Sequence, residues 1–213
     1  GLRVLRQGGD AIDCGASGAT LRFLLPLAMA LGRTGLHLTG TPRLLERPLS
    51  APYPVARENA GYRITEPLTP GRYALRGDET SQTVSGLLMA LPLLAEPSEL
   101  VLTTPLVSRA YVDMTLDALR LFGYTVGADG VQAYRIPGGQ TGRAPEQALC
   151  VPTDQSAAAF FGAMRTLGGD ISLADFRDDG AQGDRVFGAY MERLCREKCR
   201  LSVADCPDLA PIL

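Results

Sequence analysis

The chain repeats one phrase three times, and this repeat limits the folds that it can adopt. Each copy has a small polar cluster, an apolar run of helical length and a short segment typical of a β-strand. The copies read GASGATLRFLLPLAMALG with LHLTG, TSQTVSGLLMALPLL with ELVLTT, and DQSAAAFFGAMRTLGG with DISLA. The interval from Ser17 to His37 equals that from Ser81 to Val101, so the first two copies share one spacing. Such internal similarity predicts a repeated supersecondary unit.

A second helical pattern follows in the later copies. YVDMTLDALRLFG and GDRVFGAYMERLCREK carry apolar residues at helical spacing, and YTVGA and RLSVA then have the pattern of strands. The sequence therefore predicts a mixed α/β chain built from repeated βαβαββ-like units. A stretch rich in Gly and Pro, residues 137–145, separates the second copy from the third. We therefore expect one domain over residues 1–149 and the start of another over residues 150–213.

Each polar cluster stands where a helix is expected to begin, and two interpretations of it are open. A Ser, Thr or Asp side chain there caps the helix by accepting a hydrogen bond from a free backbone N–H. The same helix end carries partial positive charge and binds anions. A cap needs one such side chain, which leaves Ser81 and Gln82 after Thr80 without a role. These residues alone do not choose between capping and the binding of phosphate or carboxylate.

Composition excludes several classes of protein. A formal net charge of -2 argues against a general nucleic-acid binder. No apolar run has the length of a membrane span, and no signal-peptide pattern opens the sequence. The five cysteines predict reduced thiols in a cytoplasmic protein. Cys195 and Cys199 lie one helical turn apart, but the only histidine, His37, is far from them in sequence, so a metal site is not favoured.

Asp208 is a candidate general base. It lies in CPDLAPIL between apolar residues and prolines, where burial would raise the pKa of a carboxyl group toward neutrality. The alternative is a Pro-Asp turn without a catalytic role, which the residues alone favour.

Several phrases in order resemble one known family. GASGATLRFLLPL, LTGTPRLLERPL, TSQTVSGLLMALPL, LVSRAYVDMTLDALRLFG, DQSAAAFF, QGD and CPDLAP are similar to the 5-enolpyruvylshikimate-3-phosphate synthases. The resemblance covers essentially the whole sequence. It implies an inside-out α/β barrel of the enolpyruvyl transferase type, with two similar domains and substrates bound in the cleft between them.

The resemblance also implies an activity. These enzymes transfer the carboxyvinyl group of phosphoenolpyruvate to the 5-hydroxyl of shikimate 3-phosphate and release phosphate, a step in aromatic amino-acid biosynthesis. They need no metal or organic cofactor, and the partners expected are these two small anions, with no nucleic acid and no membrane. Two anionic substrates would give the polar helix starts a purpose beyond capping.

The resemblance assigns a role to individual residues of this sequence. Thr80, Ser81 and Ser108 match the hydroxyls that hold the 3-phosphate of shikimate 3-phosphate. Gln82 matches a glutamine between the two substrates, and Tyr111 a tyrosine beside the shikimate ring. Gly18 matches a glycine of the phosphoenolpyruvate pocket, and Arg47 an arginine that clamps phosphoenolpyruvate. Asp208 matches the aspartate that takes the proton of the 5-hydroxyl, which reverses the preference for a simple turn.

Terminal motifs of the family have no counterpart in the sequence, namely a Lys-Ser segment at one end and a glutamate, arginines and a lysine at the other. We therefore expect an internal fragment of the enzyme with negligible turnover by itself. Two alternatives remain: an enolpyruvyl transferase that acts on UDP-N-acetylglucosamine, and a non-catalytic anion-binding domain. An incomplete second domain would leave apolar surface uncovered, so self-association is a further expectation.

Overall fold

A computed structural model describes residues 5, 8–47, 49, 53–130, 132–178 and 180–213. These residues form two compact units. The first holds Gly1–Leu106 and Thr115–Ala144, and the second holds Val107–Met114 and Pro145–Leu213. The expected division, with most of one domain over residues 1–149 and the first part of a second over residues 150–213, stays a prediction.

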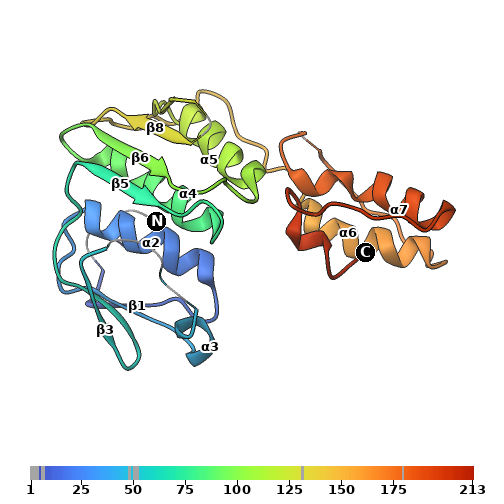
Figure 1. Cartoon of the computed structure of the whole chain (residues 1–213), viewed down its shortest axis with the longest axis horizontal. Helices are drawn as coiled ribbons and strands as arrows, with labels where there is room; N and C mark the ends of the chain where they lie inside the picture. The colour runs from blue at the N-terminus through green and yellow to red at the C-terminus, as the bar shows by residue number, and fades with distance from the viewer. Residues whose placement is uncertain (1–4, 6–7, 48, 50–52, 131, 179) are drawn as a thin grey trace. The chain divides into compact units, whose positions relative to one another are not determined.

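The described strands of the first unit form two four-stranded sheets with one topology (Figure 1). The strand order is β1-β2-β4-β3 in one sheet and β5-β6-β8-β7 in the other. In each sheet the first two strands named are parallel and the later pairs are antiparallel. The strands are β1 (Ala11–Asp13), β2 (His37–Thr39), β3 (Val55–Glu58), β4 (Gly61–Ile64), β5 (Arg72–Leu75), β6 (Ser98–Leu102), β7 (Gly127–Ala128) and β8 (Ala133–Ile136).

Helices complete the repeat in the same positions. The first copy contains α2 (Gly18–Ala30) and α3 (Pro42–Leu45), and the second contains α4 (Ser81–Ala90), followed by the 3-10 turn η1 (Leu91–Leu93), and α5 (Arg109–Leu121). Each copy therefore runs β-α-β-α-β-β, and the predicted mixed α/β repeat is confirmed. The fully buried side chains of this unit come from both helices and sheets: Leu25, Met29, Leu38, Leu44, Ile64, Val84, Leu87, Leu88, Leu91, Leu100 and Ile136.

The second unit has the helices of a third copy but none of its expected strands. It contains α6 (Gln155–Thr166), η2 (Gly183–Val186), α7 (Phe187–Arg196) and η3 (Pro207–Leu209), with α6 and α7 packed together (Figure 1). The strands expected at DISLA and RLSVA are wrong, because neither segment is a strand in the described residues. A strand requires hydrogen bonds to a neighbouring strand, and no described segment of this unit pairs with either one.

The helices α2 and α6 end with the same backbone motif. Gly32 after α2 has φ of 72°, its N–H donates to Met29, and the next N–H donates to Ala28. Gly168 after α6 has φ of 96° and equivalent bonds to Arg165 and Met164. This is the Schellman motif, which favours glycine because a side chain is strained at positive φ. The Leu-Gly that closes both apolar runs therefore fixes where each helix ends.

Helices α2 and α4 meet at one very close contact. Pro26 has no N–H to donate to the carbonyl of Arg22 one turn earlier in α2. Gly86 of α4 packs against that carbonyl, and a Cβ built on Gly86 would lie 2.3 Å from the Arg22 oxygen and 3.2 Å from the Pro26 ring. Only glycine allows the two backbones to approach this closely.

Replacing Gly86 with alanine should therefore lower the free energy of unfolding by about 1–3 kcal/mol, because the added Cβ overpacks the α2–α4 contact. Gly188 is the matched control, since it lies in α7 with nothing within 4 Å of a Cβ. Gly188→Ala should be neutral or stabilise by up to about 1 kcal/mol through helix propensity. Urea denaturation followed by circular dichroism measures both changes, and equal stability of the two variants would contradict the close contact.

Candidate functional site

Each polar cluster of the repeat caps its helix through one side chain. Ser17 accepts from the Thr20 N–H at 3.1 Å to cap α2, and Thr80 accepts from the Gln82 N–H at 3.2 Å to cap α4. Asp154 caps α6 by accepting from the Ala157 N–H at 3.0 Å. The capping interpretation is thus confirmed for these three residues. Ser81 is the first residue of α4 and is buried, while the Gln82 side chain is half-buried.

Two arginines gather with Gln82 around Gly18 at the start of α2. Arg22 Nη1 donates to Gln82 Oε1 at 3.2 Å, which links α2 to α4. A Cβ built on Gly18 would lie 2.6 Å from Arg22 Nη1, 3.4 Å from Gln82 Oε1 and 3.5 Å from Arg47 Nη1. Gly18 therefore lies directly beside both guanidinium groups, and the three predicted residues Gly18, Arg47 and Gln82 are brought together.

The electrostatics of this cluster favour an anion. Arg22 is 7% exposed. Burial, and then the charge of Arg47, lower the pKa of the Arg22 guanidinium. Two like charges in a partly desolvated place repel each other, and a bound anion would relieve both that repulsion and the loss of water. The N-terminus of α2 adds partial positive charge at the same point.

In the second unit the Tyr111 hydroxyl lies between two carboxylates. Its oxygen is 2.9 Å from Asp184 Oδ2 and 3.0 Å from Asp208 Oδ2. Burial of the ring, followed by the hydrogen bond and charge of Asp184 and then those of Asp208, raises the pKa of Tyr111. The phenol consequently stays protonated and acts as a hydrogen-bond donor at physiological pH. Tyr111 and Asp208, both predicted site residues, are direct neighbours.

The predicted burial of Asp208 is wrong. Asp208 is exposed, whereas the next residue, Leu209, is fully buried. Both lie in η3, and this tight turn points Leu209 into the small core around Ala159 and Cys206 while Asp208 faces outward. The Pro-Asp turn is therefore present, and its exposure leaves the carboxylate accessible to a ligand.

Ser108 precedes α5 in a strained backbone conformation. Its φ is 56°, a region that non-glycine residues rarely adopt, and its N–H donates to the Ala204 carbonyl at 3.3 Å. The Ser108 carbonyl accepts from the Tyr111 N–H at 3.1 Å. Strain of this kind gathers at functional sites, and here it fixes the turn from which Tyr111 projects.

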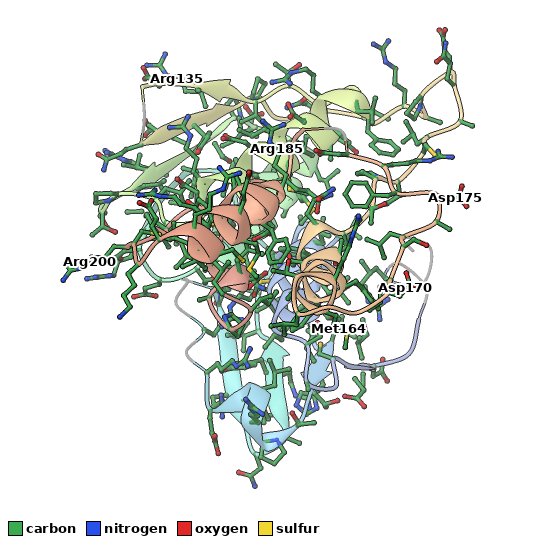
Figure 2. The ribbon with its side chains drawn as sticks, turned by 90° about the vertical axis from the view of Figure 1, so that its right-hand side faces the viewer. Arg135, Met164, Asp170, Asp175, Arg185 and Arg200 are labelled. Carbon is green, nitrogen blue, oxygen red and sulfur yellow. The ribbon has the colours of Figure 1, made fainter. Side chains whose placement is uncertain are left out.

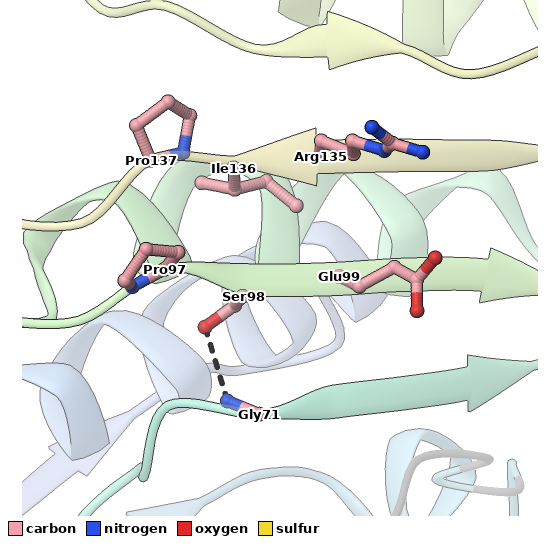
Figure 3. Close-up of a pocket in the computed structure, with 7 residues that line it drawn as sticks. All are labelled: Gly71, Pro97, Ser98, Glu99, Arg135, Ile136 and Pro137. Carbon is pink, nitrogen blue, oxygen red and sulfur yellow. Dashed lines mark hydrogen bonds between the residues drawn. The ribbon is translucent and has the colours of Figure 1, made fainter.

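An open hollow of about 560 Å³ lies on the second sheet, away from the predicted site residues (Figure 3). Its polar groups already have partners: Ser98 accepts from the Gly71 N–H, Glu99 pairs with Arg72, and Arg135 pairs with Asp129. We therefore assign no ligand to it. Among the described residues, no group of three or more His, Cys, Asp or Glu is arranged to hold a metal ion. No described helix is both long and apolar enough to cross a membrane.

Comparison with known proteins finds one family. The sequence profile of EPSP synthase (3-phosphoshikimate 1-carboxyvinyltransferase) matches residues 2–200. The chain belongs to the EPSP synthase family. The 3-phosphoshikimate 1-carboxyvinyltransferase of Clostridium kluyveri is 37% identical, over 95% of this chain and 53% of that protein. The 3-phosphoshikimate 1-carboxyvinyltransferase of Clostridium novyi is 33% identical, over 100% of this chain and 54% of that protein.

Solved structures agree with this family. EPSP synthase from Acinetobacter baumannii is 25% identical with a TM-score of 0.54, over 73% of this chain and 36% of that one. The enolpyruvyl transferase NikO from Streptomyces tendae is 19% identical with a TM-score of 0.51, over 86% of this chain and 45% of that one, and it shows the fold alone. The predicted enolpyruvyl transferase fold is confirmed. The chain spans about half the length of the curated relatives that it matches.

Two residues of these clusters were not among the predicted site residues. Arg22 is a lone charge within the apolar run LRFLLPLAMA, and a charged residue on a buried helix is a signal for a partner or ligand. Asp184 is the aspartate of QGD, a phrase that helps define the EPSP synthase family resemblance but that by itself gives no contact. Spacing in the sequence does not predict that Arg22 contacts Gln82 of α4. It also does not predict that Asp184 contacts Tyr111 of α5.

Removing the cap of α4 tests how much the Thr80 side chain contributes to the stability of the fold. Thr80→Ala should cost about 1 kcal/mol of unfolding free energy, since the Gln82 N–H loses its acceptor, whereas Thr80→Ser keeps the acceptor and should cost little. Chemical denaturation of the three proteins measures this difference. An alanine variant as stable as the serine variant would show that the cap contributes nothing.

Proposed function

We propose that this chain takes part in transferring the carboxyvinyl group of phosphoenolpyruvate to the 5-hydroxyl of shikimate 3-phosphate, with release of phosphate. The observation that carries the proposal is the pair of arginines, Arg22 and Arg47, beside Gly18 and Gln82. Membership of the EPSP synthase family and the names of its relatives support the same reaction.

The first unit supplies what an anionic substrate requires. A guanidinium group presents several N–H donors in a planar fork that matches phosphate and carboxylate oxygens. Arg47 is exposed and so is available to phosphoenolpyruvate, while the buried Arg22 orients the Gln82 amide by donating to its oxygen. Gly18 leaves room beside these groups because it has no Cβ. We assign phosphoenolpyruvate to this cluster.

The second unit supplies an acceptor for the proton of a hydroxyl nucleophile. In the proposed reaction the 5-oxygen attacks the substituted alkene carbon of phosphoenolpyruvate, and the exposed Asp208 carboxylate accepts its proton. In the same step the methylene carbon takes up a proton from solvent. Later loss of phosphate, together with one proton of the methyl group so formed, restores the double bond. Roles for Thr80, Ser81 and Ser108 at the 3-phosphate remain predictions from the family resemblance.

Calorimetric titration of the chain with phosphoenolpyruvate, in the presence of shikimate 3-phosphate, tests the arginine cluster. Arg47→Ala should weaken phosphoenolpyruvate binding by about tenfold to a hundredfold, because a hydrogen bond to a charged group contributes about 1.5–3 kcal/mol. Arg43→Ala is the matched control: it removes the same charge from an exposed position in α3, four residues before Arg47, and it should change the affinity little.

An equal loss of affinity in the two variants would show that only net charge matters. It would contradict the assignment of phosphoenolpyruvate to Arg47. Titration of the unmodified chain with UDP-N-acetylglucosamine identifies the acceptor substrate. Binding of this nucleotide sugar in place of shikimate 3-phosphate would transfer the proposal to the other class of enolpyruvyl transferase.

We also propose that the chain associates with a second copy of itself through α6. Phe160, Met164 and Leu167 follow each other at helical spacing, and they are 54%, 54% and 87% exposed (Met164 is labelled in Figure 2). Phe161 beside them is 46% exposed. A continuous apolar face of this kind on a helix is typical of an association surface. A second copy presents the same apolar chemistry, so two such faces would cover each other.

Sedimentation should therefore show a concentration-dependent increase in mass for the unmodified chain. Substituting Met164 and Leu167 with serine should shift the equilibrium toward monomer, since two exposed apolar anchors are removed. Val107→Ser is the control, because this exposed apolar residue lies outside α6, in the loop before α5. A single monomeric species at high protein concentration would contradict the proposed self-association.

A cytoplasmic location and a domain boundary near Cys150 complete the proposal. All five cysteines, Cys14, Cys150, Cys195, Cys199 and Cys206, are free thiols, which is typical of proteins in a reducing compartment. Burial, with the charge of Asp13, raises the pKa of the Cys14 thiol to about 11. That thiol is accordingly protected by its surroundings from ionisation and oxidation.

A further inference from the structure

Asp184 is a buried acid that the proposed reaction does not use. Its side chain belongs to η2 and is 1% exposed. Asp184 Oδ2 lies 2.9 Å from both the Tyr111 hydroxyl and Ser156 Oγ, and no donor among the described residues reaches Oδ1. A buried carboxylate is costly unless hydrogen bonds compensate for lost water. Asp184 consequently depends on the hydroxyl groups of Tyr111 and Ser156.

The Tyr111 hydroxyl has one proton but faces two carboxylates. Asp184 and Asp208 lie at nearly equal distances, 2.9 and 3.0 Å, and one proton can be donated to only one of them at a time. Asp208 is exposed, so water can donate to it instead. Asp184 is buried and has no such alternative. Loss of the Tyr111 donation would therefore cost more at Asp184 than at Asp208.

We propose that Asp184 is a positioning residue: it takes the proton donation of Tyr111 and thereby leaves the Asp208 carboxylate open to accept a proton from the ligand. This inference rests on the proposed function, in which Asp208 is the base. When the ligand O–H bond breaks, an Asp208 O–H bond forms, and this new O–H donates to the phenol oxygen. Tyr111 keeps its own proton and its bond to Asp184, and no other side chain of this cluster gains or loses a proton.

The electrostatic effects of Asp184 agree with this arrangement. After burial, its hydrogen bond and charge are the largest causes that raise the pKa of Tyr111, ahead of those of Asp208. Burial, then the charge of Asp184 and that of Asp205, also raise the pKa of the Cys206 thiol, two positions before Asp208 in the chain. The charge of Asp184 thus reaches the turn that carries Asp208 as well as the phenol.

Fluorine NMR of the full 213-residue chain tests the proposal, with fluorinated tyrosine incorporated and the Tyr111 signal assigned by Tyr111→Phe. The fluorinated phenol is more acidic than the natural one, so its titration midpoint lies at lower pH. Asp184→Asn should lower the titration midpoint of Tyr111 by about one pH unit or more, and Asp208→Asn should lower it less. Asp205→Asn, which removes a nearby exposed acid, should leave the midpoint unchanged.

Ser156→Ala provides a prediction of opposite sign. Asp184 loses its second hydroxyl donor, so its bond to Tyr111 strengthens and the Tyr111 midpoint should rise. This variant also decides the matter if Asp184→Asn fails to fold. A midpoint that is unchanged or lowered in Ser156→Ala would overturn the proposal. It would also be overturned if Asp208→Asn shifted the midpoint as much as Asp184→Asn, or if Asp184→Asn had no effect.

Calorimetric titration with shikimate 3-phosphate separates this inference from the function on which it rests. Absence of binding by the unmodified chain would overturn the proposed function and the part assigned to the ligand proton. The order of the fluorine midpoints, measured without ligand, still decides whether Asp184 or Asp208 receives the Tyr111 proton.

Discussion

The close contact of α2 with α4 is the constraint on which the first unit depends. Pro26 has no N–H to donate to the Arg22 carbonyl, and Gly86, which has no side chain, packs directly against that carbonyl. Because the helices approach so closely, the Arg22 side chain reaches Gln82 on the neighbouring helix. The cluster of Arg22, Gln82 and Gly18 is therefore a product of helix packing. Pro26 and Gly86 have no reactive side chains, but their packing positions Arg22 and Gln82.

One local design in the repeat serves capping and is compatible with the proposed anion binding. A polar residue caps each helix and fixes where it begins, and the same helix end then offers N–H groups and partial positive charge to a ligand. Thr80 shows the first purpose directly, because its oxygen accepts from the Gln82 N–H. Capping and anion binding are thus compatible uses of neighbouring residues in one cluster.

Local patterns in the sequence predicted the helices, their caps and the repeated unit, because these depend on neighbours a few residues apart. They failed at DISLA and RLSVA, since a strand exists only through a partner that propensity does not supply. Gly18, Arg47, Gln82, Tyr111 and Asp208 were found through family resemblance. The partnerships of Arg22 with Gln82 and of Asp184 with Tyr111 span 60 and 73 positions, so they emerge only from tertiary packing.

The choice of arginine around Gly18 has a consequence for how the protein responds to acidity. Arginine side chains keep their charge throughout the pH range of living cells, whereas histidine loses its charge there. A phosphate monoester changes its own charge near pH 6, at its second ionisation of about 6. The positive charge of an anion site made of arginine is therefore constant over this pH range, and only the charge of the ligand changes. If phosphoenolpyruvate binds here as proposed, a change of pH would alter the charge of the ligand and not that of the two arginines.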